Sequence, residues 1–245
     1  MEKILALWAV PRSTSTAFEH MMRERGDYLV IDEPFGLSFY YSEERCNTSR
    51  YPDIKPNSEY NFGRTLDKLK QENEKQSVFI KDMSYQVIPV ANQEFLSHFD
   101  NTFLIRNPAK MLPSLFNNWA DFTLEETGYA QHYKLFEMAK EISGRVPIVI
   151  DSDDLVQKPK ATVEAYCNVL GIPFIEEALE WKAKPQPQIN QWEGGWHNYL
   201  QSSQGFKARE NKTYASVEDN EHLRQAYEYC LPYYQSLYEN RLVIV

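Results

Sequence analysis

The 245-residue sequence has little of what marks several large classes of protein. It has three cysteines, which are far apart and in no metal-ligand spacing, so neither a disulfide framework nor a zinc site is expected. Only 26 Lys and Arg stand against 35 Asp and Glu, and this net charge of −9 argues against nucleic acid as the main partner. No apolar run is long enough to span a bilayer. We therefore expect a cytoplasmic protein with no membrane partner.

Glycine is missing where a nucleotide triphosphate loop would need it. The first glycine is Gly26, and the pattern G-x-x-x-x-G-K-[ST] does not occur at the first strand-to-helix turn. This absence disfavours a kinase or a nucleotide hydrolase. A small-molecule kinase on a related P-loop-like fold remains an alternative.

That first turn carries a cation and four hydroxyl groups. An apolar strand, Ile4 to Val10, runs into Pro11, and a helix follows from Thr16. The side chains between them are those of Arg12, Ser13, Thr14, Ser15 and Thr16. Because a helix N-terminus presents unpaired N–H groups and the positive end of its dipole, this turn predicts a phosphate or sulfate site. The alternative is an ordinary capped helix with a surface arginine.

Alternating apolar and helical-period segments predict an α/β fold, a central parallel sheet flanked by helices. The expected strands are Ile4–Ala9, Tyr28–Ile31, Val78–Ile80, Thr102–Ile105 and Pro147–Ile150. The expected helices are Thr16–Arg25, Glu59–Glu74, Tyr85–Ser97, Pro108–Asp121, Leu124–Ser143, Pro159–Leu170 and Val217–Glu239. We expect one domain, 1–245, with irregular lid or acceptor segments near 36–56 and 184–212.

Polar residues follow the expected strands and should meet at one edge of the sheet. They are Arg12, Glu33, Lys81, Arg106 and Asp151. Ligands of open parallel sheets bind beyond the carboxyl ends of the strands, so this convergence predicts a single cleft.

A second anion motif is Arg106, which leaves an expected strand, with Ser114 eight residues later. The arginine can supply a bidentate charge and the serine a hydroxyl donor to one phosphate. A solvent-facing arginine with an incidental serine is the alternative.

Together the two motifs resemble those of the sulfotransferase family that uses 3′-phosphoadenosine 5′-phosphosulfate (PAPS), which has a P-loop-like fold. The resemblance implies that the first motif holds the 5′-phosphosulfate and the second the 3′-phosphate. Residues 153–159, running on to 169–173, are similar to the family's "YEDL…P…LG" passage, and 194–199 to its "GDWKN" loop. PAPS is thus the implied co-substrate, and no metal is expected.

The departures from the family pattern are informative. Arg12 replaces the usual Lys and Thr14 the usual Gly, which looks more like the tyrosylprotein and bacterial carbohydrate branches. Met83 stands where cytosolic members place their base histidine. The resemblance therefore implies Glu33 as the base. The alternative for Glu33 is a salt bridge to Arg12 or Lys81 that only shapes the site; Asp32 is the rival base, but alternation should turn it the other way.

By the same resemblance, Arg12 and Lys81 act on the bridging and transferring oxygens, helped by the loop hydroxyls. The usual Arg-Lys-Gly clamp is missing at 189–191, and Lys207 or Arg209 can replace it, unless both are solvated loop charges. The expected reaction is sulfuryl transfer to a hydroxyl, less readily an amine, of a small organic acceptor. A non-catalytic nucleotide-binding module is the rival. The C-terminal 242–245 can be an edge strand or the contact of a homodimer.

Several further side chains were assigned from their position alone. His98, His132 and His222 are expected at the surface. His20 is expected to be structural, with action on the acceptor as the alternative, and His197 in the late loop can reach the cleft. Aromatic walls of the cleft are expected from Phe35, Phe39, Tyr40 and Tyr41, and either core or acceptor pocket from Trp119, Phe122, Tyr129 and Tyr133.

Overall fold

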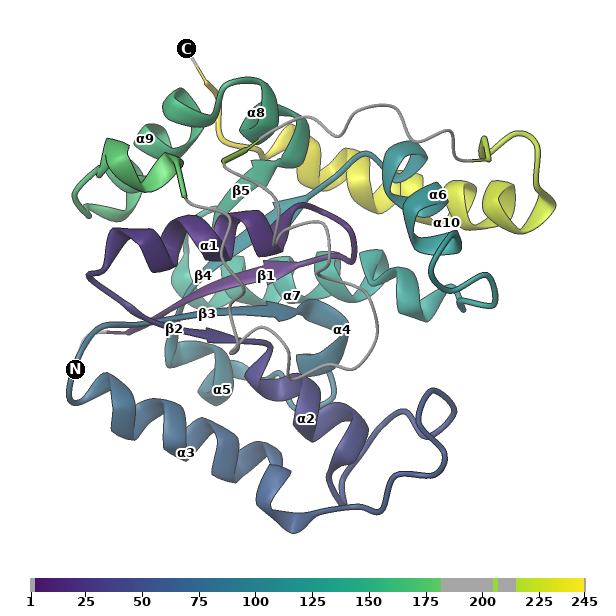
Figure 1. Cartoon of the computed structure of the whole chain (residues 1–245), viewed down its shortest axis with the longest axis horizontal. Coiled ribbons are helices and arrows are strands. Elements are labelled where there is room, and N and C mark those ends of the chain that lie inside the picture. Colours follow the sequence, from purple (N-terminus) through teal and green to yellow (C-terminus); the bar gives the residue numbers. More distant parts are fainter. Residues whose placement is uncertain (1–2, 182–204, 207–214, 245) are drawn as a thin grey trace.

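Five parallel strands form the centre of the protein (Figure 1), in a computed structural model that describes residues 3–181, 205–206 and 215–244. The sheet order is β2-β3-β1-β4-β5, and every pairing is parallel, which confirms the expected α/β architecture. The strands are β1 (Ile4–Ala9), β2 (Leu29–Asp32), β3 (Val78–Met83), β4 (Phe99–Ile105) and β5 (Ile148–Asp151).

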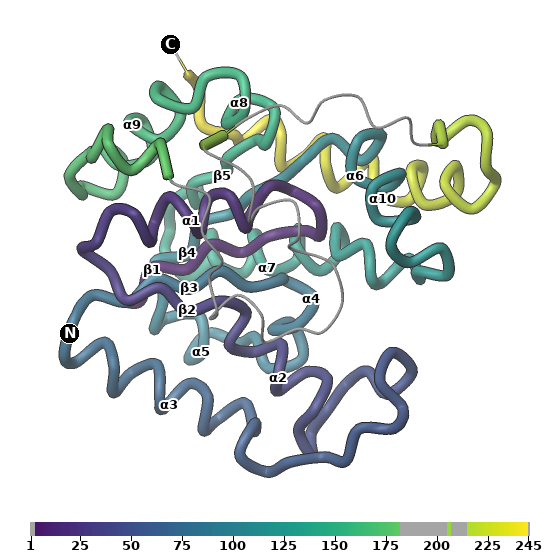
Figure 2. The backbone as a smooth tube through the Cα atoms, viewed as in Figure 1, coloured from purple at the N-terminus to yellow at the C-terminus, as the bar shows by residue number. Residues whose placement is uncertain are grey.

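Helices cover both faces of the sheet, as the backbone tube in Figure 2 also shows. One face carries α1 (Ser15–Arg25), α8 (Ser152–Gln157), α9 (Pro159–Leu170) and the short η3 (Glu176–Leu179). The other face carries α2 (Pro34–Tyr41), α3 (Phe62–Asn73), α4 (Ser84–Val87), α5 (Gln93–Ser97), α6 (Pro108–Phe116), α7 (Tyr129–Ser143) and α10 (Glu221–Glu239). Two short turns of helix, η1 (Ser58–Tyr60) and η2 (Glu125–Thr127), complete the described elements.

Alternation along β1 divides the core into two layers. Ile4, Ala6 and Trp8 belong to the layer under α7 and α10, whereas Leu5 and Leu7 belong to the layer under α1 and α9. All six β1 residues are buried, as a central strand of a parallel sheet requires. The end of β1 is therefore held rigidly in the middle of the sheet.

Sequence signals explain where several helices start and stop. Pro108 and Pro159 occupy first-turn positions, as predicted, because a proline lacks the N–H that a first turn leaves unused. Gly26 and Gly171 end α1 and α9 with positive φ angles of 74° and 71°, which glycine adopts without a Cβ clash.

The helix expected over Leu124–Ser143 is interrupted at Gly128, after which α7 begins at Tyr129. One further helix and one irregular segment also need correction. The single helix expected over Tyr85–Ser97 is divided into α4 and α5, because Pro89 has no N–H to continue the helix and Asn92 caps a new helix by accepting the Phe95 N–H at 2.9 Å. The irregular segment expected near 36–56 begins with helix: α2 starts at Pro34.

A parallel bridge joins Arg241 to Val149, and the Leu242 N–H donates to the Val149 carbonyl at 2.7 Å. The end of the described chain thus runs beside β5, at the edge of the sheet. The pairing is limited to this one bridge, and residues 242–244 have no strand conformation.

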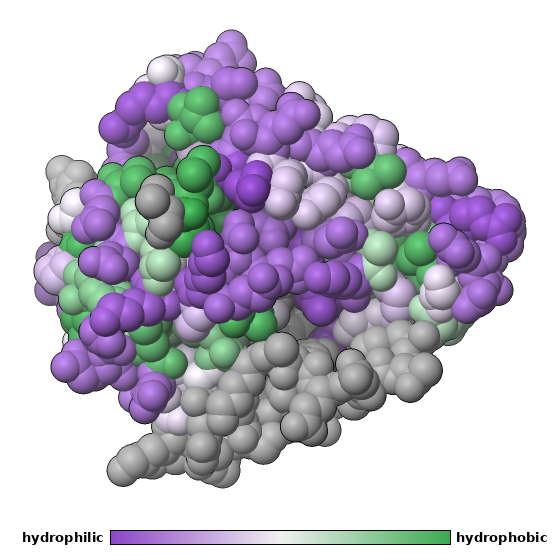
Figure 3. All heavy atoms as spheres, turned by 90° about the horizontal axis from the view of Figure 1, so that it is seen from above, coloured by the Kyte–Doolittle hydropathy of each residue, from purple (hydrophilic) through white to green (hydrophobic). Residues whose placement is uncertain are grey.

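The face seen in Figure 3 is mostly hydrophilic, with hydrophobic side chains gathered toward one side of it. No helix among the described residues is long and apolar enough to cross a membrane.

Candidate functional site

The site begins at the turn between β1 and α1. The Thr14 carbonyl accepts the N–H groups of Ala17 and Phe18, at 3.0 and 3.2 Å, which starts the helix. The first N–H groups of α1 have no partner inside the helix. They therefore point outward, beyond the carboxyl end of β1. Ser13 donates its hydroxyl to the Val10 carbonyl at 2.7 Å and is fully buried, so it braces the turn from within.

The two predicted anion motifs contact each other. Arg12 Nε donates to Ser114 Oγ at 3.0 Å, and Arg106 Nη1 donates to the Arg12 carbonyl at 2.7 Å. Arg106 is held in turn from α7, where the Tyr129 hydroxyl donates to the Arg106 carbonyl. The R-x7-S pair and the first turn are therefore one structural unit.

Thr14 extends this unit to the last strand. Its hydroxyl bonds to the Ser13 carbonyl and lies 2.6 Å from Ser152 Oγ, at the start of α8. Asp151, predicted at the same strand end, caps α8 by accepting the Asp153 N–H at 2.8 Å, and it also accepts the Tyr234 hydroxyl at 3.2 Å. Asp151 is thus engaged in structural contacts.

Backbone strain is concentrated at the site. The non-glycine residues with positive φ in the described part of the chain are Arg12 at 60°, Thr14 at 68° and Glu33 at 40°. Each such residue costs of order 1–3 kcal/mol and persists only where the surroundings enforce it. All three are residues that the sequence assigned to the site.

Glu33 lies in a tight turn between β2 and α2. Its N–H donates to the Lys81 carbonyl at 2.7 Å, and the Phe35 N–H donates to Asp82 Oδ2 at 2.8 Å. Burial, with a smaller contribution from the Glu33 charge, raises the pKa of Asp82 well above its ordinary value. These contacts, together with Pro34, hold the left-handed backbone of Glu33.

Lys81 lies elsewhere than the sequence suggested. It is inside β3, which continues to Met83, and it pairs with Leu7 on one side and Asp32 on the other. Cα partners in a parallel sheet point to the same face, so the Lys81 side chain lies beneath α1, where no part of it is exposed.

Three carboxylates surround the Lys81 ammonium. Its Nζ contacts Asp32 Oδ1, lies 2.6 Å from Glu33 Oε1 and is 3.9 Å from Glu19 Oε2. Burial opposes the charge, but the carboxylates, Asp32 first, outweigh burial and raise the pKa of Lys81. The ammonium is therefore committed to carboxylates, and the salt bridge proposed as the alternative for Glu33 is present.

Asp32 and Glu33 reach the same ammonium, although strand alternation would send them to opposite faces. The reason is the positive φ of Glu33, which takes it out of the extended conformation. Asp32 has 2% of its side chain exposed and Glu33 has 12%. Of the two candidate bases, Glu33 is the one nearer to solvent.

A second donor reaches Glu33 from α4. Gln86 Nε2 donates to Glu33 Oε2 at 3.3 Å and lies 3.5 Å from the Tyr85 hydroxyl, which is 3.2 Å from that of Tyr40. Sequence reasoning missed Gln86. Its position five residues after Lys81, directly beyond β3, was the available signal.

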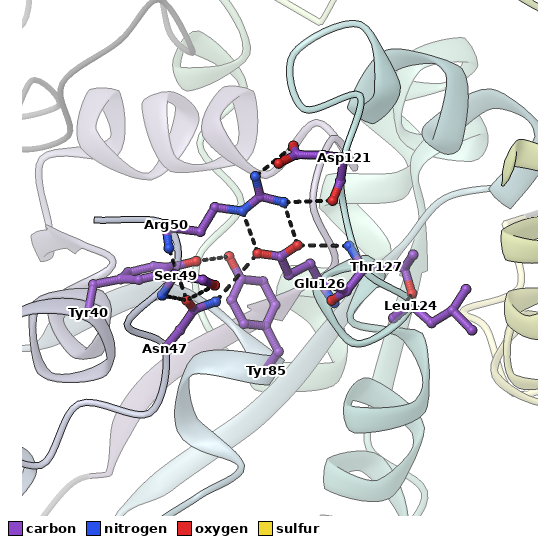
Figure 4. Close-up of polar contacts among 10 residues, drawn as sticks. Tyr40, Asn47, Ser49, Arg50, Tyr85, Asp121, Leu124, Glu126 and Thr127 are labelled. Carbon is purple, nitrogen blue, oxygen red and sulfur yellow. Dashed lines mark hydrogen bonds and ion pairs between the residues drawn. The ribbon is translucent and has the colours of Figure 1, made fainter. Parts of the chain in front are cut away.

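The segment after α2 is fastened by Arg50 (Figure 4). Its guanidinium makes two 2.6 Å hydrogen bonds to Glu126 and one of 2.8 Å to Asp121, and it lies 4.4 Å from the centre of the Trp119 ring. The hydrogen bonds to Glu126 make the largest contribution to raising the pKa of Arg50. Trp119 thus packs against this ion pair.

Three of the four aromatic residues expected as walls of the cleft are core instead, and Phe122 and Tyr129 follow the core alternative given for them. Phe35, Phe39, Tyr40, Phe122 and Tyr129 are at most 9% exposed and pack in the layer that includes α7 and α10. The i, i+4 spacing of Phe35 and Phe39 places both on the buried face of α2.

The surface position predicted for His132 is wrong. His132 is fully buried, its Nδ1 lies 2.6 Å from Ser84 Oγ, and burial lowers its pKa to about 3. His20 is 3% exposed and stacks on Trp181, and burial, then Arg23, lowers its pKa to about 4. His20 therefore has a structural contact, as expected.

The sheet order separates two kinds of charge. Arg12 and Arg106 follow β1 and β4, whereas two of the carboxylates around Lys81, those of Asp32 and Glu33, lie at the end of β2. The third, that of Glu19, comes from α1. The sheet edge therefore has a cationic half suited to an anion and a carboxylate half suited to accepting a proton. Lys207, Arg209 and the predicted loop at 194–199 lie outside the described residues.

Comparisons with known proteins show which proteins the chain is similar to. Branched-chain-amino-acid aminotransferase-like protein 2 of Arabidopsis thaliana is 28% identical over 243 residues, which make up 96% of this chain and 41% of that protein. Sulfotransferase ppzF of Metarhizium rileyi is 29% identical over 127 residues, 43% of this chain and 37% of that one. The chain thus spans less than half the length of these relatives.

The sulfotransferase domain of the Synechococcus PCC 7002 olefin synthase has the same fold, with a TM-score of 0.54 at 15% identity over 93% of this chain and 94% of that one. A family model described as a sulfotransferase domain matches residues 2–240. The chain therefore belongs to the sulfotransferase domain family.

Proposed function

We propose that the protein transfers a sulfuryl group from PAPS to a hydroxyl of a small organic acceptor. The observation that carries this proposal is the joined unit of Arg12, Ser114 and Arg106 around a strained helix-start turn. Two guanidinium groups and the first N–H groups of α1 meet there, which is the chemistry that a donor with separate phosphate groups requires.

The donor is assigned to the cationic half of the sheet edge. Arg12, the hydroxyls of Ser15 and Thr16 and the first turn of α1 take the phosphosulfate end. Arg106 and Ser114 take the 3′-phosphate. Ser13 and Thr14 act on the turn itself, because their hydroxyls bond to the Val10 and Ser13 carbonyls.

Glu33 is assigned as the base. In-line sulfuryl transfer spreads charge over peripheral oxygens, so the enzyme mainly positions the reactants and stabilises charge, as in phosphoryl transfer. The acceptor hydroxyl gives its proton to Glu33 as its oxygen bonds to sulfur. Lys81 takes no part at the sulfuryl oxygens in this proposal; its ammonium holds Glu33, which leaves Arg12 as the cation for the moving group.

Aromatic rings support an acceptor with an apolar part. Tyr51 is half-buried and packs against Tyr40 and Tyr41, with ring centres 5.2 and 5.3 Å apart. Burial first, and then the charge of Glu33, raises the pKa of Tyr51. We assign this ring to the acceptor side of the carboxylate as part of the proposal.

The test is Glu33→Gln, which keeps the shape of the side chain but removes its basicity. We expect kcat to fall by about 10²–10⁴, with binding of the desulfated nucleotide unchanged in calorimetry. Turnover near that of the wild type would refute the assignment of Glu33.

Two further measurements separate the rival classes. Transfer of label from ³⁵S-PAPS to a metabolite extract distinguishes an enzyme from a nucleotide-binding module without activity. We expect that transfer to survive EDTA, whereas phosphoryl transfer by a kinase requires Mg²⁺.

A further inference from the structure

The two oxygens of the Glu33 carboxylate have different donors. Oε1 receives the Lys81 ammonium at 2.6 Å, and Oε2 receives the Gln86 carboxamide at 3.3 Å. Both donors are buried, Lys81 fully and Gln86 to 2% exposure. Both also come from one segment, residues 81–86, at the end of β3 and in α4.

This difference makes the two oxygens unequal as bases. A charge-assisted hydrogen bond is shorter and about twice as strong as a neutral one, so the ammonium engages the lone pairs of Oε1 more strongly than Gln86 engages those of Oε2. Oε2, with a neutral donor at a longer distance, keeps the lone pair better suited to taking a proton. A second cation in place of Gln86 would remove that advantage.

The orientation of the Gln86 carboxamide is fixed by its partner. An ionised carboxylate only accepts hydrogen bonds, so the amide nitrogen, and not the oxygen, faces Glu33. Gln86 Oε1 is then left buried with no hydrogen-bond partner among the described residues. No described contact to that oxygen therefore favours the opposite orientation of the carboxamide.

We propose that Gln86 is a positioning residue that presents Oε2 of Glu33 to the acceptor. The proposal rests on the proposed function of Glu33 as the base. The acceptor O–H bond breaks and its proton goes to Oε2, while the acceptor oxygen bonds to sulfur. The bond between sulfur and the bridging oxygen breaks, and its electron pair stays on the phosphate of the desulfated nucleotide.

Other charged and titratable groups act on Glu33, and they must stay constant in any test. Asp32 and Glu19 share the Lys81 ammonium with it, and electrostatic interactions connect it to three more groups, those of Asp82, Tyr85 and Tyr51. Substitution of Gln86 alone leaves all of them in place.

The test compares Gln86→Met, which keeps the length of the side chain without its donor, with Gln86→Glu, which puts a carboxylate against Oε2. For Gln86→Met we expect kcat to fall about tenfold, with KM for PAPS within about twofold of the wild type. The acidic limb of kcat/KM against pH should move up by about one unit, because the charged base has lost a donor. In Gln86→Glu the same limb should move further, because like charges then face each other.

Gln131→Met is the matched control. Gln131 also has a buried carboxamide oxygen without a partner in the described part of the chain, but it lies on α7. We expect its pH profile and kcat to match those of the wild type.

Each outcome decides between the two proposals. If Glu33→Gln loses turnover while the Gln86→Met profile is unchanged, the role of Gln86 is refuted and that of Glu33 stands. If Glu33→Gln turns over normally, the base assignment itself fails. If Gln86→Met does not fold, Gln86→Glu decides, since an unshifted acidic limb in that variant contradicts the proposal.

Discussion

Replacing Lys81 by methionine tests what its ammonium does. The ammonium is fully buried, and the carboxylates of Asp32, Glu33 and Glu19 surround it. Methionine fills a similar volume and removes the only cation that these three carboxylates share in the described contacts. If the ammonium holds the cluster together, its loss changes folding more than it changes donor binding.

The magnitude follows from the geometry. Removal of one partner of a buried ion pair costs about 3–5 kcal/mol, since the remaining charge is left uncompensated. Asp32 and Glu33 lose this cation, whereas Glu19 keeps its ion pair with Arg23 at 2.6 Å, so we expect the unfolding free energy at pH 7.5 to fall by about 4 kcal/mol. Domains of this size have about 5–15 kcal/mol of stability, so the variant should still fold.

The loss should depend on pH. Carboxylates left without their cation hold protons more tightly in the folded than in the unfolded state. Folding of the variant then takes up protons, so its deficit shrinks as the pH falls from 7.5 toward 5.

Urea unfolding followed by tryptophan fluorescence measures these differences, because Trp8 is completely buried in the folded protein. Lys110→Met is the control: Lys110 pairs with Asp153 at 2.7 Å, but half of its side chain is exposed, so a loss of at most about 1 kcal/mol is expected. A Lys81→Met variant as stable as this control, with donor affinity at least tenfold weaker, would show that the ammonium serves the donor.

Three other predictions concern the donor site, the segment after α2 and the core. Arg106→Ala should weaken calorimetric binding of the desulfated nucleotide at least about tenfold, by loss of a charge-assisted contact; unchanged binding would contradict the R-x7-S interpretation. Arg50→Ala should lower the unfolding free energy by about 2 kcal/mol, because Glu126 loses two hydrogen bonds; this value lies between those for buried and for exposed ion pairs. Urea unfolding measures the change, and a value below about 0.5 kcal/mol, roughly that of a surface substitution, would refute the prediction. Since burial lowers the pKa of His132 to about 3, against 6.5 in the unfolded chain, the unfolded state takes the proton first and stability falls below pH 6.5, by about 2 kcal/mol at pH 5. His132→Phe should flatten that dependence in urea unfolding at pH 7 and 5.

The sheet was predictable because each strand contains a continuous apolar run and each is buried by helices on both sides. All five expected strands exist, and their parallel pairing follows from the helices between them. The contact between the two anion motifs also follows from this pattern, since β1 and β4 are neighbours and both motifs lie at their carboxyl ends.

The role of Lys81 was not predictable from local pattern. A lysine after three apolar residues suggests the end of a strand. Strand β3 instead continues through Lys81, because carboxylates from β2, α1 and the Glu33 turn pair with the buried ammonium. These elements are up to 62 residues away in the chain, and no spacing rule connects them. The turn at Glu33 was hidden for a similar reason, since a positive φ at a glutamate depends on contacts from residues 81–86 and is not favoured by the residue itself.

The division of charge along the sheet edge has a consequence for what happens after transfer. A neutral alcohol approaches the carboxylate half without electrostatic penalty, but once it is a sulfate ester it carries a negative charge in the same place. Under the proposed reaction, once Glu33 has passed its proton to water, repulsion from the carboxylates around Lys81 favours departure of the ester, while the proposed contacts of Arg12 and Arg106 hold the spent nucleotide. In this proposal, the strand order β2-β3-β1-β4 in the sheet thus determines the order of product release: the sulfated product leaves before the nucleotide.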